Sequence, residues 1–171
     1  MARSEQLTFH VPSEGSLENL LTFGDGLQRA GDPSCDSPAA LLAIAGEIYE
    51  LPQRSEVTNF ARRLGLLPDA APWRLTSRAR GILSCQQPVQ RDVLHYLAYT
   101  CWDNASPARN VPFWSYHRTV DLLWQHGSMH VKAAAATLVE DVVGASRENF
   151  SGVDGYNPDS VSYSTKSVRG V

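Results

Sequence analysis

The side chains best suited to chemistry in this chain are a group of arginines, an amide and hydroxyls between residues 54 and 80. Arginine can hold a phosphate or a guanine edge through paired N–H donors, asparagine can pair with adenine, and serine or threonine can bond to either. This is the chemistry of recognition rather than of bond making. The candidate set for contact with duplex DNA is Arg54, Ser55, Thr58, Asn59, Arg62, Arg63, Arg74, Arg78 and Arg80.

The first part of this set falls on a predicted helix over residues 54–64. Its apolar residues recur at i, i+3, i+4 and i+7, which is one face of a helix: Val57, Phe60, Ala61 and Leu64. The opposite face is polar, with Ser55, Asn59 and Arg62 at its middle and Thr58 and Arg63 on its flanks. On this face, Asn59 is the best candidate for reading a base, and Arg62 could read guanine or hold a phosphate.

The residues after this helix predict a turn, a strand and a basic helix. Gly65 supplies a left-handed helix stop, and the prolines of 68–72 predict a compact turn. Residues 73–75 are expected to form a short strand, and Thr76 to cap a helix over 77–83. Three arginines of this part would hold phosphates beside the first helix: Arg74, Arg78 and Arg80.

A supporting helix is predicted just before residue 54. Ser37 and Pro38 provide an N-cap followed by proline at the first helical position. An apolar stripe then runs to the expected end at Leu51 and Pro52, and consists of Leu41, Ile44, Ala45 and Ile48. The bend between this helix and the next would be a helix-turn-helix element.

The order of helix, Leu-Gly-Leu-Leu, turn, Trp-Arg-Leu-Thr and basic helix over residues 38–84 resembles a prokaryotic winged helix-turn-helix domain. In that family a recognition helix is followed by a β-hairpin wing, and Gly often stands where this chain has Ala79. The resemblance implies DNA binding, although many winged helices bind only proteins. We expect a mainly α fold with a small β-hairpin wing, followed by a helical unit or, alternatively, a second winged-helix-like unit.

The distribution of charge supports the same segment. The chain carries a net charge of −3, but residues 1–50 hold −6, residues 51–91 hold +5 and residues 92–171 hold −2. A basic patch on an acidic protein is typical of a DNA-contacting face, because phosphate neutralisation drives much of the affinity. The alternative is that these arginines only solvate exposed helix faces.

Three segments make up the predicted domain organisation. Residues 1–36 form an acidic N-terminal segment, 37–104 a winged-helix-like domain, and 112–171 a helical or incomplete second winged-helix-like domain. The polar, Pro-containing stretch 105–112 is the expected boundary.

Several local expectations fill in these segments. A short helix after Ser16 should be interrupted by Gly24 and Gly26, and residues 144–161 should be a loop. A helix over 87–102 should bury one side, formed by Val89, Val93, Leu94, Leu97 and either Cys101 or Trp102. A helix over 113–126 should bury its large aromatics, because such residues are more often core than base-stacking platforms: Phe113, Trp114 and Trp124.

The last ten residues, 162–171, resemble the opening of a recognition helix, with Ser164 as N-cap and Val168 and Val171 facing inward. The outward residues form a second candidate set for DNA contact: Lys166, Ser167 and Arg169. Because this helix stops without a Gly stop or a following wing, we expect the sequence to be the N-terminal part of a longer protein.

The sequence predicts no enzyme, cofactor or metal site. It lacks a Gly-rich phosphate loop, Gly-x-Ser-x-Gly and His-Glu-x-x-His, and its three cysteines have no Cys-x-x-Cys spacing. No apolar run reaches the roughly eighteen residues of a membrane-spanning helix, and the N-terminus lacks the order of a signal peptide. We therefore expect a cytoplasmic location and no membrane partner.

Two functions remain open. The first is a DNA-binding module that belongs to a longer protein or a multi-subunit complex. The second is a non-catalytic protein-interaction subunit, or a self-associating one, of a prokaryotic assembly that acts on DNA, such as an antiviral defence or chromosome-maintenance complex. An exposed stripe of Arg62, Arg63, Arg74, Arg78 and Arg80 would favour DNA, whereas internal pairing would favour interaction, with the expected acidic partners being Glu47, Glu50 and Glu56.

Overall fold

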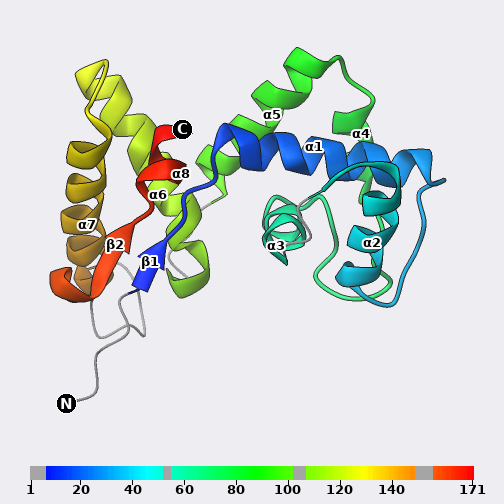
Figure 1. Cartoon of the computed structure of the whole chain (residues 1–171), viewed down its shortest axis with the longest axis horizontal. Coiled ribbons are helices and arrows are strands. Elements are labelled where there is room, and N and C mark those ends of the chain that lie inside the picture. The colour runs from blue at the N-terminus through cyan, green and yellow to red at the C-terminus, as the bar shows by residue number, and fades with distance from the viewer. Residues whose placement is uncertain (1–6, 52–54, 102–106, 149–155) are drawn as a thin grey trace. The chain divides into compact units, whose positions relative to one another are not determined.

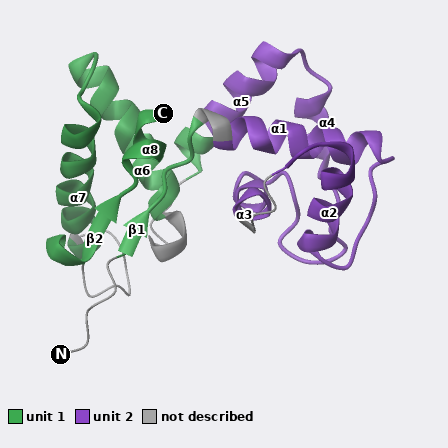
Figure 2. Ribbon diagram, in the orientation of Figure 1, with its two compact units in different colours: residues 1–14, 98–171 green, residues 15–97 purple. Residues whose placement is uncertain are grey.

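The computed structural model is mainly helical and divides the chain into two compact units, shown in Figure 2. Unit 1 comprises residues 1–14 and 98–171, and unit 2 comprises residues 15–97. The structure describes residues 7–51, 55–101, 107–148 and 156–171, with backbone alone at 14–15, 55, 107–110 and 148. No helix in these ranges is long and apolar enough to cross a membrane.

Unit 2 is built from helices (Figure 1). They are α1 (Glu14–Arg29), α2 (Pro38–Ile48), α3 (Ser55–Arg63), α4 (Ser77–Leu83) and the greater part of α5 (Gln87–Thr100). Its core includes side chains that are at most 2% exposed, and they come from all five helices and the α3–α4 connection: Phe23, Leu27, Leu41, Ala61, Leu75, Ala79 and Leu94, among others.

Helix α1 continues through both glycines, so the expected interruption at Gly24 and Gly26 was wrong. A Cβ atom at Gly24 would lie 2.8 Å from Cδ1 of Leu83 on α4, and one at Gly26 would lie 3.2 Å from Cβ of Ala45 on α2. The two glycines therefore let neighbouring helices approach the α1 backbone. Close packing outweighs the modest cost of glycine within a helix.

The predicted helix caps of unit 2 are present. Ser37 Oγ accepts a hydrogen bond from the backbone N–H of Ala40 at 3.2 Å, and Thr76 Oγ1 accepts one from Ala79 at 3.2 Å. Gly65 follows α3 in the left-handed region, at φ +69°. Each of these signals acts within a few residues of its own position, which is why local sequence predicts it.

The expected β-hairpin wing between α3 and α4 does not form in residues 64–76, all of which are described. Trp73 instead pairs with Cys35, in the α1–α2 connection, through two backbone hydrogen bonds of 2.9 Å. Pro68 and Pro72 lack the N–H donors that a hairpin ladder needs. Trp73, which was predicted to lie in a strand, thus pairs with a residue that is distant in the sequence and not with a neighbouring strand.

Unit 1 combines helices with a short parallel sheet (Figure 1). Its elements are β1 (Leu7–Phe9), α6 (Pro107–His126), α7 (Val131–Glu148), the 3-10 turn η1 (Pro158–Ser160), β2 (Val161–Tyr163) and α8 (Thr165–Arg169). β1 pairs with β2, with Leu7 opposite Val161 and Phe9 opposite Tyr163. α7 packs against α6, β2 and α8.

The pairing of β1 with β2 explains why the observed division differs from the expected one. Residues 1–14 group with the C-terminal part of the chain, and the division falls after Leu97, within α5. The predicted linker at 105–112 is helical from Pro107, and the remainder of it lies outside the described residues. The predicted loop at 144–161 is likewise shortened, because α7 continues to Glu148.

Trp124 contradicts the expected aromatic core of α6. Phe113 is buried as predicted and Trp114 is half-buried, but Trp124 is 90% exposed. The buried stripe of α6 includes Ser115 and Thr119. Trp124 lies nine residues after Ser115, which places it about 180° around the helix from that stripe.

Helix α8 has the predicted cap but not the predicted continuation. Ser164 Oγ accepts from the backbone N–H of Ser167 at 3.4 Å, and Val168 is buried. The helix ends at Arg169 with Gly170 as its C-cap, although Gly170, at φ −86°, is not a left-handed stop of the kind found at Gly65. A Cβ at Gly170 would lie 2.6 Å from Cβ of Ser13, which favours glycine there.

Candidate functional site

The polar face of α3 is narrower than its periodicity predicts. Arg54 and the side chain of Ser55 lie outside the described residues. Thr58 is only 5% exposed, so its expected position on the flank of an outer face was wrong. Asn59 is exposed and Arg63 is half-buried. The buried sector of α3 thus includes Thr58 as well as the apolar stripe, because unit 2 contacts this helix over a wider arc than four residues indicate.

Arg62 contacts the connection that follows its own helix. The Arg62 guanidinium carbon lies 5.2 Å from the ring centroid of Trp73, and Nη2 lies 3.7 Å from Asp69 Oδ1. Nε of Arg62 is buried and has no hydrogen-bond partner among the described residues. The side chain therefore holds the α3–α4 connection against α3, with the aromatic contact contributing more than the exposed ion pair.

Arg78 and Arg80 also contact unit 2 itself. Arg78 Nη1 donates to the backbone carbonyl of Leu64 at 3.3 Å, just past the C-terminal end of α3. A cation at this position is stabilised by the negative end of the helix dipole. Arg80 Nη1 donates to Asp32 Oδ2 at 2.6 Å. The other carboxylate oxygen of Asp32 is buried without a hydrogen-bond partner among the described residues, so this pair is tied to the α1–α2 connection.

The candidate arginines therefore do not form one exposed stripe. Arg74 and Arg78 are exposed, but Arg62 and Arg80 are partly covered by the groups they contact. The acidic partners are Asp69 and Asp32, where the sequence suggested Glu47, Glu50 and Glu56. The basic segment of unit 2 is in large part a set of internal contacts.

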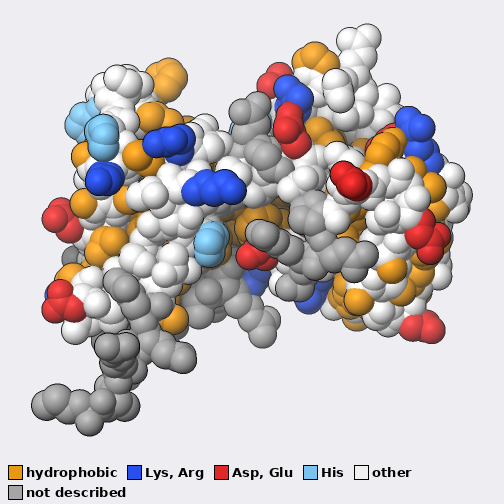
Figure 3. All heavy atoms as spheres, viewed as in Figure 1, with side chains coloured by type: hydrophobic (Ala, Val, Ile, Leu, Met, Phe, Trp, Pro, Cys, Tyr) orange, Lys and Arg blue, Asp and Glu red, His pale blue; other side chains and the backbone are white. Residues whose placement is uncertain are grey.

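The second candidate set, on α8 of unit 1, is divided in its roles. Ser167 Oγ accepts from the backbone N–H of Val11 at 3.3 Å and donates to the Ser164 carbonyl at 2.9 Å, so this hydroxyl is engaged inside the unit. Lys166 and Arg169 are exposed. None of the ion pairs between described residues involves either of them. Figure 3 shows basic and histidine side chains on the visible face of unit 1.

An exposed apolar pair on α5 was not predicted. Val89 is 46% exposed, although its position in the helical pattern suggested burial, and Tyr96 is 66% exposed. The two residues are seven apart, so they lie on the same face of the helix. Leu94 lies on another face of α5, in the core of unit 2. The seven-residue spacing between Val89 and Tyr96 is the feature of the sequence that indicates their shared face.

Two buried hydroxyl groups in unit 1 have a structural role. Ser115 is fully buried, with Oγ 2.6 Å from the hydroxyl of Tyr163 and 2.5 Å from the Val111 carbonyl. Burial raises the pKa of the Tyr163 hydroxyl well above its usual range. A nucleophile needs access to its substrate, and this pair has none, so it joins β2 to α6 instead.

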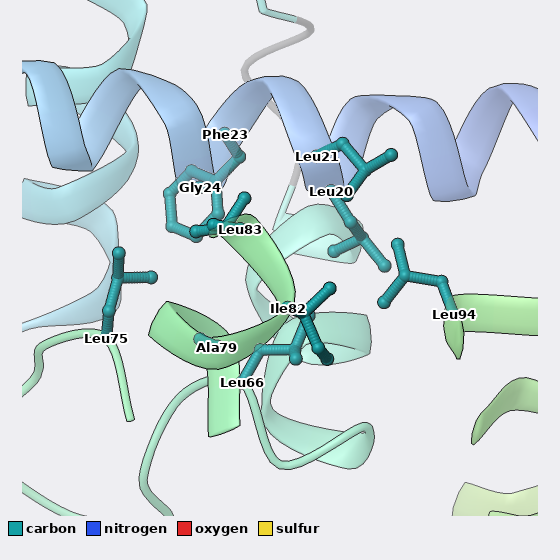
Figure 4. Close-up of a pocket in the computed structure, with 10 residues that line it drawn as sticks. All are labelled: Leu20, Leu21, Phe23, Gly24, Leu66, Leu75, Ala79, Ile82, Leu83 and Leu94. Carbon is teal, nitrogen blue, oxygen red and sulfur yellow. The ribbon is translucent and has the colours of Figure 1, made fainter. Parts of the chain in front are cut away.

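Unit 2 also contains a small apolar gap, shown in Figure 4. Its volume is about 10 Å³, and the surrounding residues come from α1, α4, α5 and the α3–α4 connection. The side chains that face it include Leu20, Phe23, Leu66 and Ile82. That volume is near the lower limit for a single water molecule, so the gap is a packing defect and not a ligand site.

Over the described ranges, no three His, Cys, Asp or Glu side chains gather closely enough to hold a metal ion. Comparisons with protein-family models, with curated proteins and with solved structures find no match. The observations that bear on function are therefore the contacts within each unit and the chemistry of the exposed side chains on α5 and α8.

Proposed function

We propose that this chain is a non-catalytic protein-interaction module, in which the basic segment of unit 2 holds the unit together. The observation that carries the proposal is that Arg62, Arg78 and Arg80 each contact an acceptor or a ring within unit 2. To bind phosphates, these guanidinium groups would have to leave their present contacts. A prokaryotic assembly that acts on DNA would suit such a module, by analogy with winged-helix subunits.

The exposed face of α5 is the proposed docking surface. Val89 and Tyr96 lie on it, with the half-buried Val93 between them. Tyrosine is enriched at protein interfaces because its ring contributes a large apolar area while its hydroxyl can still reach a hydrogen-bond partner. An exposed tyrosine beside an exposed valine therefore fits a partner with an apolar groove or helix face.

Site-specific photo-crosslinking in the source cells tests this proposal. A photoreactive residue at Tyr96 should give one discrete protein adduct, identified by mass spectrometry, and Val89→Asp should abolish that adduct. The matched control is a photoreactive residue at Glu47, which is exposed on α2 of the same unit and should give no adduct of that mass. Equal adducts at both positions, or none at Tyr96, would rule out this face as the docking surface.

DNA binding by α3 is the second candidate function. Asn59 is exposed at the middle of the polar face, and Arg74 is exposed in the segment that follows. An exposed amide with an arginine nearby in sequence could contact one base and a flanking phosphate. If so, Asn59→Ala should reduce sequence preference, while Arg74→Ala should weaken binding to every duplex alike.

A further inference from the structure

Unit 1 contains an open pocket that is separate from the proposed docking face on α5 and includes Arg169 of the second candidate set. Its volume is about 320 Å³, which is at the lower end of the range for small-molecule sites. It lies among α6, the start of α7, and α8 with the residue that follows Gly170. The apolar part of its lining is contributed by Leu122, Leu123, Met129, Val131, Ala134, Val168 and Val171.

The polar part of the lining consists of Thr119, His130 and Arg169, of which Arg169 carries a positive charge. Arg169 lines the pocket, and no hydrogen bond or ion pair with a described residue involves its guanidinium. His130 lines it as well, and no Asp or Glu is present among the described residues of the lining. No acidic side chain of the described lining would therefore oppose a bound carboxylate, whereas a cationic ligand would meet Arg169.

The ring of His130 is oriented by a hydrogen bond from the backbone of Lys132. His130 Nδ1 lies 3.3 Å from the backbone N–H of Lys132 and accepts its hydrogen, so Nε2 carries the proton of the neutral ring. The imidazole thus offers an N–H donor in addition to the guanidinium of Arg169. The 18-residue helix α7 begins beside this ring, at Val131, and its positive N-terminal end adds to the preference for an anion.

We propose that this pocket binds a small aliphatic carboxylate. The carboxylate would pair with Arg169, and a hydrocarbon tail would lie between α6 and α8, where Met129 can adapt to its shape. The volume limits the tail to a short or medium chain. This site is independent of the proposed docking face on α5, and either one could exist without the other.

Calorimetric titration of the full chain with hexanoate and octanoate tests the proposal. Each added CH₂ should tighten binding by about threefold to fourfold, because the tail enters apolar surroundings. Octanol, which keeps the tail and loses the charge, should bind more weakly than octanoate. If affinity does not change with chain length, or if octanol binds as well as octanoate, the proposal is wrong.

Two variants test the assignment of the charge. Arg169→Gln should weaken octanoate binding by about tenfold and leave octanol unchanged. The matched control is Arg147→Gln, which removes the same charge from another exposed position of unit 1 and should change the affinity less than twofold. Because Arg169 is exposed, its substitution should leave the fold intact, which a thermal melt can check. Equal loss in both variants would indicate general electrostatic attraction and overturn the site.

A filling variant tests the tail. Ala134→Phe should occupy the apolar space and prevent octanoate binding, and the thermal melt again checks folding. A peptide that ends in a free leucine carboxylate serves as the competing ligand. If it binds while octanoate does not, the pocket recognises a peptide terminus, and the assignment to a small aliphatic acid is wrong.

Discussion

In unit 2, Arg62 and Arg80 lie against acidic groups of the same unit, whereas on α8 of unit 1 Lys166 and Arg169 are exposed and have no acidic partner among the described residues. Both regions carry basic residues at helical spacing, and the sequence suggested DNA contact for each. The number of cations in a segment therefore does not show how many of them are available to bind DNA, because nearby carboxylates and carbonyls can already hold them.

The two units also differ in what lies inside them. The gap in unit 2 is lined by apolar residues, while unit 1 buries tyrosine side chains, including Tyr163 and Tyr116. Burial raises the pKa of Tyr116 to about 12. Substitutions and changes of pH can distinguish polar groups that stabilise a unit from polar groups that are exposed on its surface.

Alkaline pH should destabilise unit 1 through Tyr116. Because burial raises the pKa of the folded-state hydroxyl to about 12, the unfolded chain loses its proton first, near pH 10. The stabilisation is complete below pH 10 and is lost as the pH rises towards 12, by up to about 3 kcal/mol. Urea unfolding between pH 9 and 12 measures the loss. Tyr116→Phe should be less sensitive over that range, and an unchanged pH dependence would contradict the assignment.

Enlarging Gly26 should destabilise unit 2. The Cβ of a new side chain would lie 3.3 Å from both Cα and the carbonyl oxygen of Ala45, and backbone atoms cannot move away as a side chain can. Gly26→Val should therefore lower the free energy of unfolding by about 1–3 kcal/mol. Thermal or urea unfolding provides the measurement. Gly81→Val is the matched control for a helical glycine with open space around it, and it should cost markedly less.

Removing Arg80 should cost more stability than removing Arg169. Arg80→Ala leaves the half-buried Asp32 without its partner and should cost about 1 kcal/mol, a figure reduced by the partial exposure of both groups. Arg169→Ala should change stability by less than about 0.5 kcal/mol. Urea unfolding of the two variants under identical conditions makes the comparison. Equal effects would remove the distinction between the paired and exposed cations.

Trp124→Ser should have the smallest effect. A buried tryptophan would cost several kcal/mol on truncation, but this side chain is 90% exposed, so the change should stay within about 0.5 kcal/mol. The melting temperature of the full chain measures it. A loss of several kcal/mol would restore the aromatic core that the helical spacing suggested.

These outcomes follow the range over which each sequence signal acts. The caps at Ser37, Thr76 and Ser164, and the stop at Gly65, depend on hydrogen bonds or dihedral angles within a few residues, and all were predicted. The pairing of Cys35 with Trp73 was not predicted, because nothing near either residue indicates its partner.

The same reasoning explains the errors in the candidate sites. Periodicity placed Thr58 on an outer face and Trp124 on an inner one, but the width of a buried sector depends on which elements pack against the helix. Likewise, β1 and β2 come from opposite ends of the chain, and their pairing determines the composition of unit 1. Long-range contacts of this kind leave no periodic or compositional mark on a single sequence.

Duplex binding across a salt series measures whether the basic segment of unit 2 is committed to internal contacts. The measurement compares the full chain with an Arg62→Ala, Arg63→Ala double variant on short random-sequence DNA. We expect no appreciable binding at about 50 mM salt and no difference between the two proteins. A micromolar Kd with a steep salt dependence that the double variant loses would contradict this expectation and establish α3 as a DNA-contacting helix.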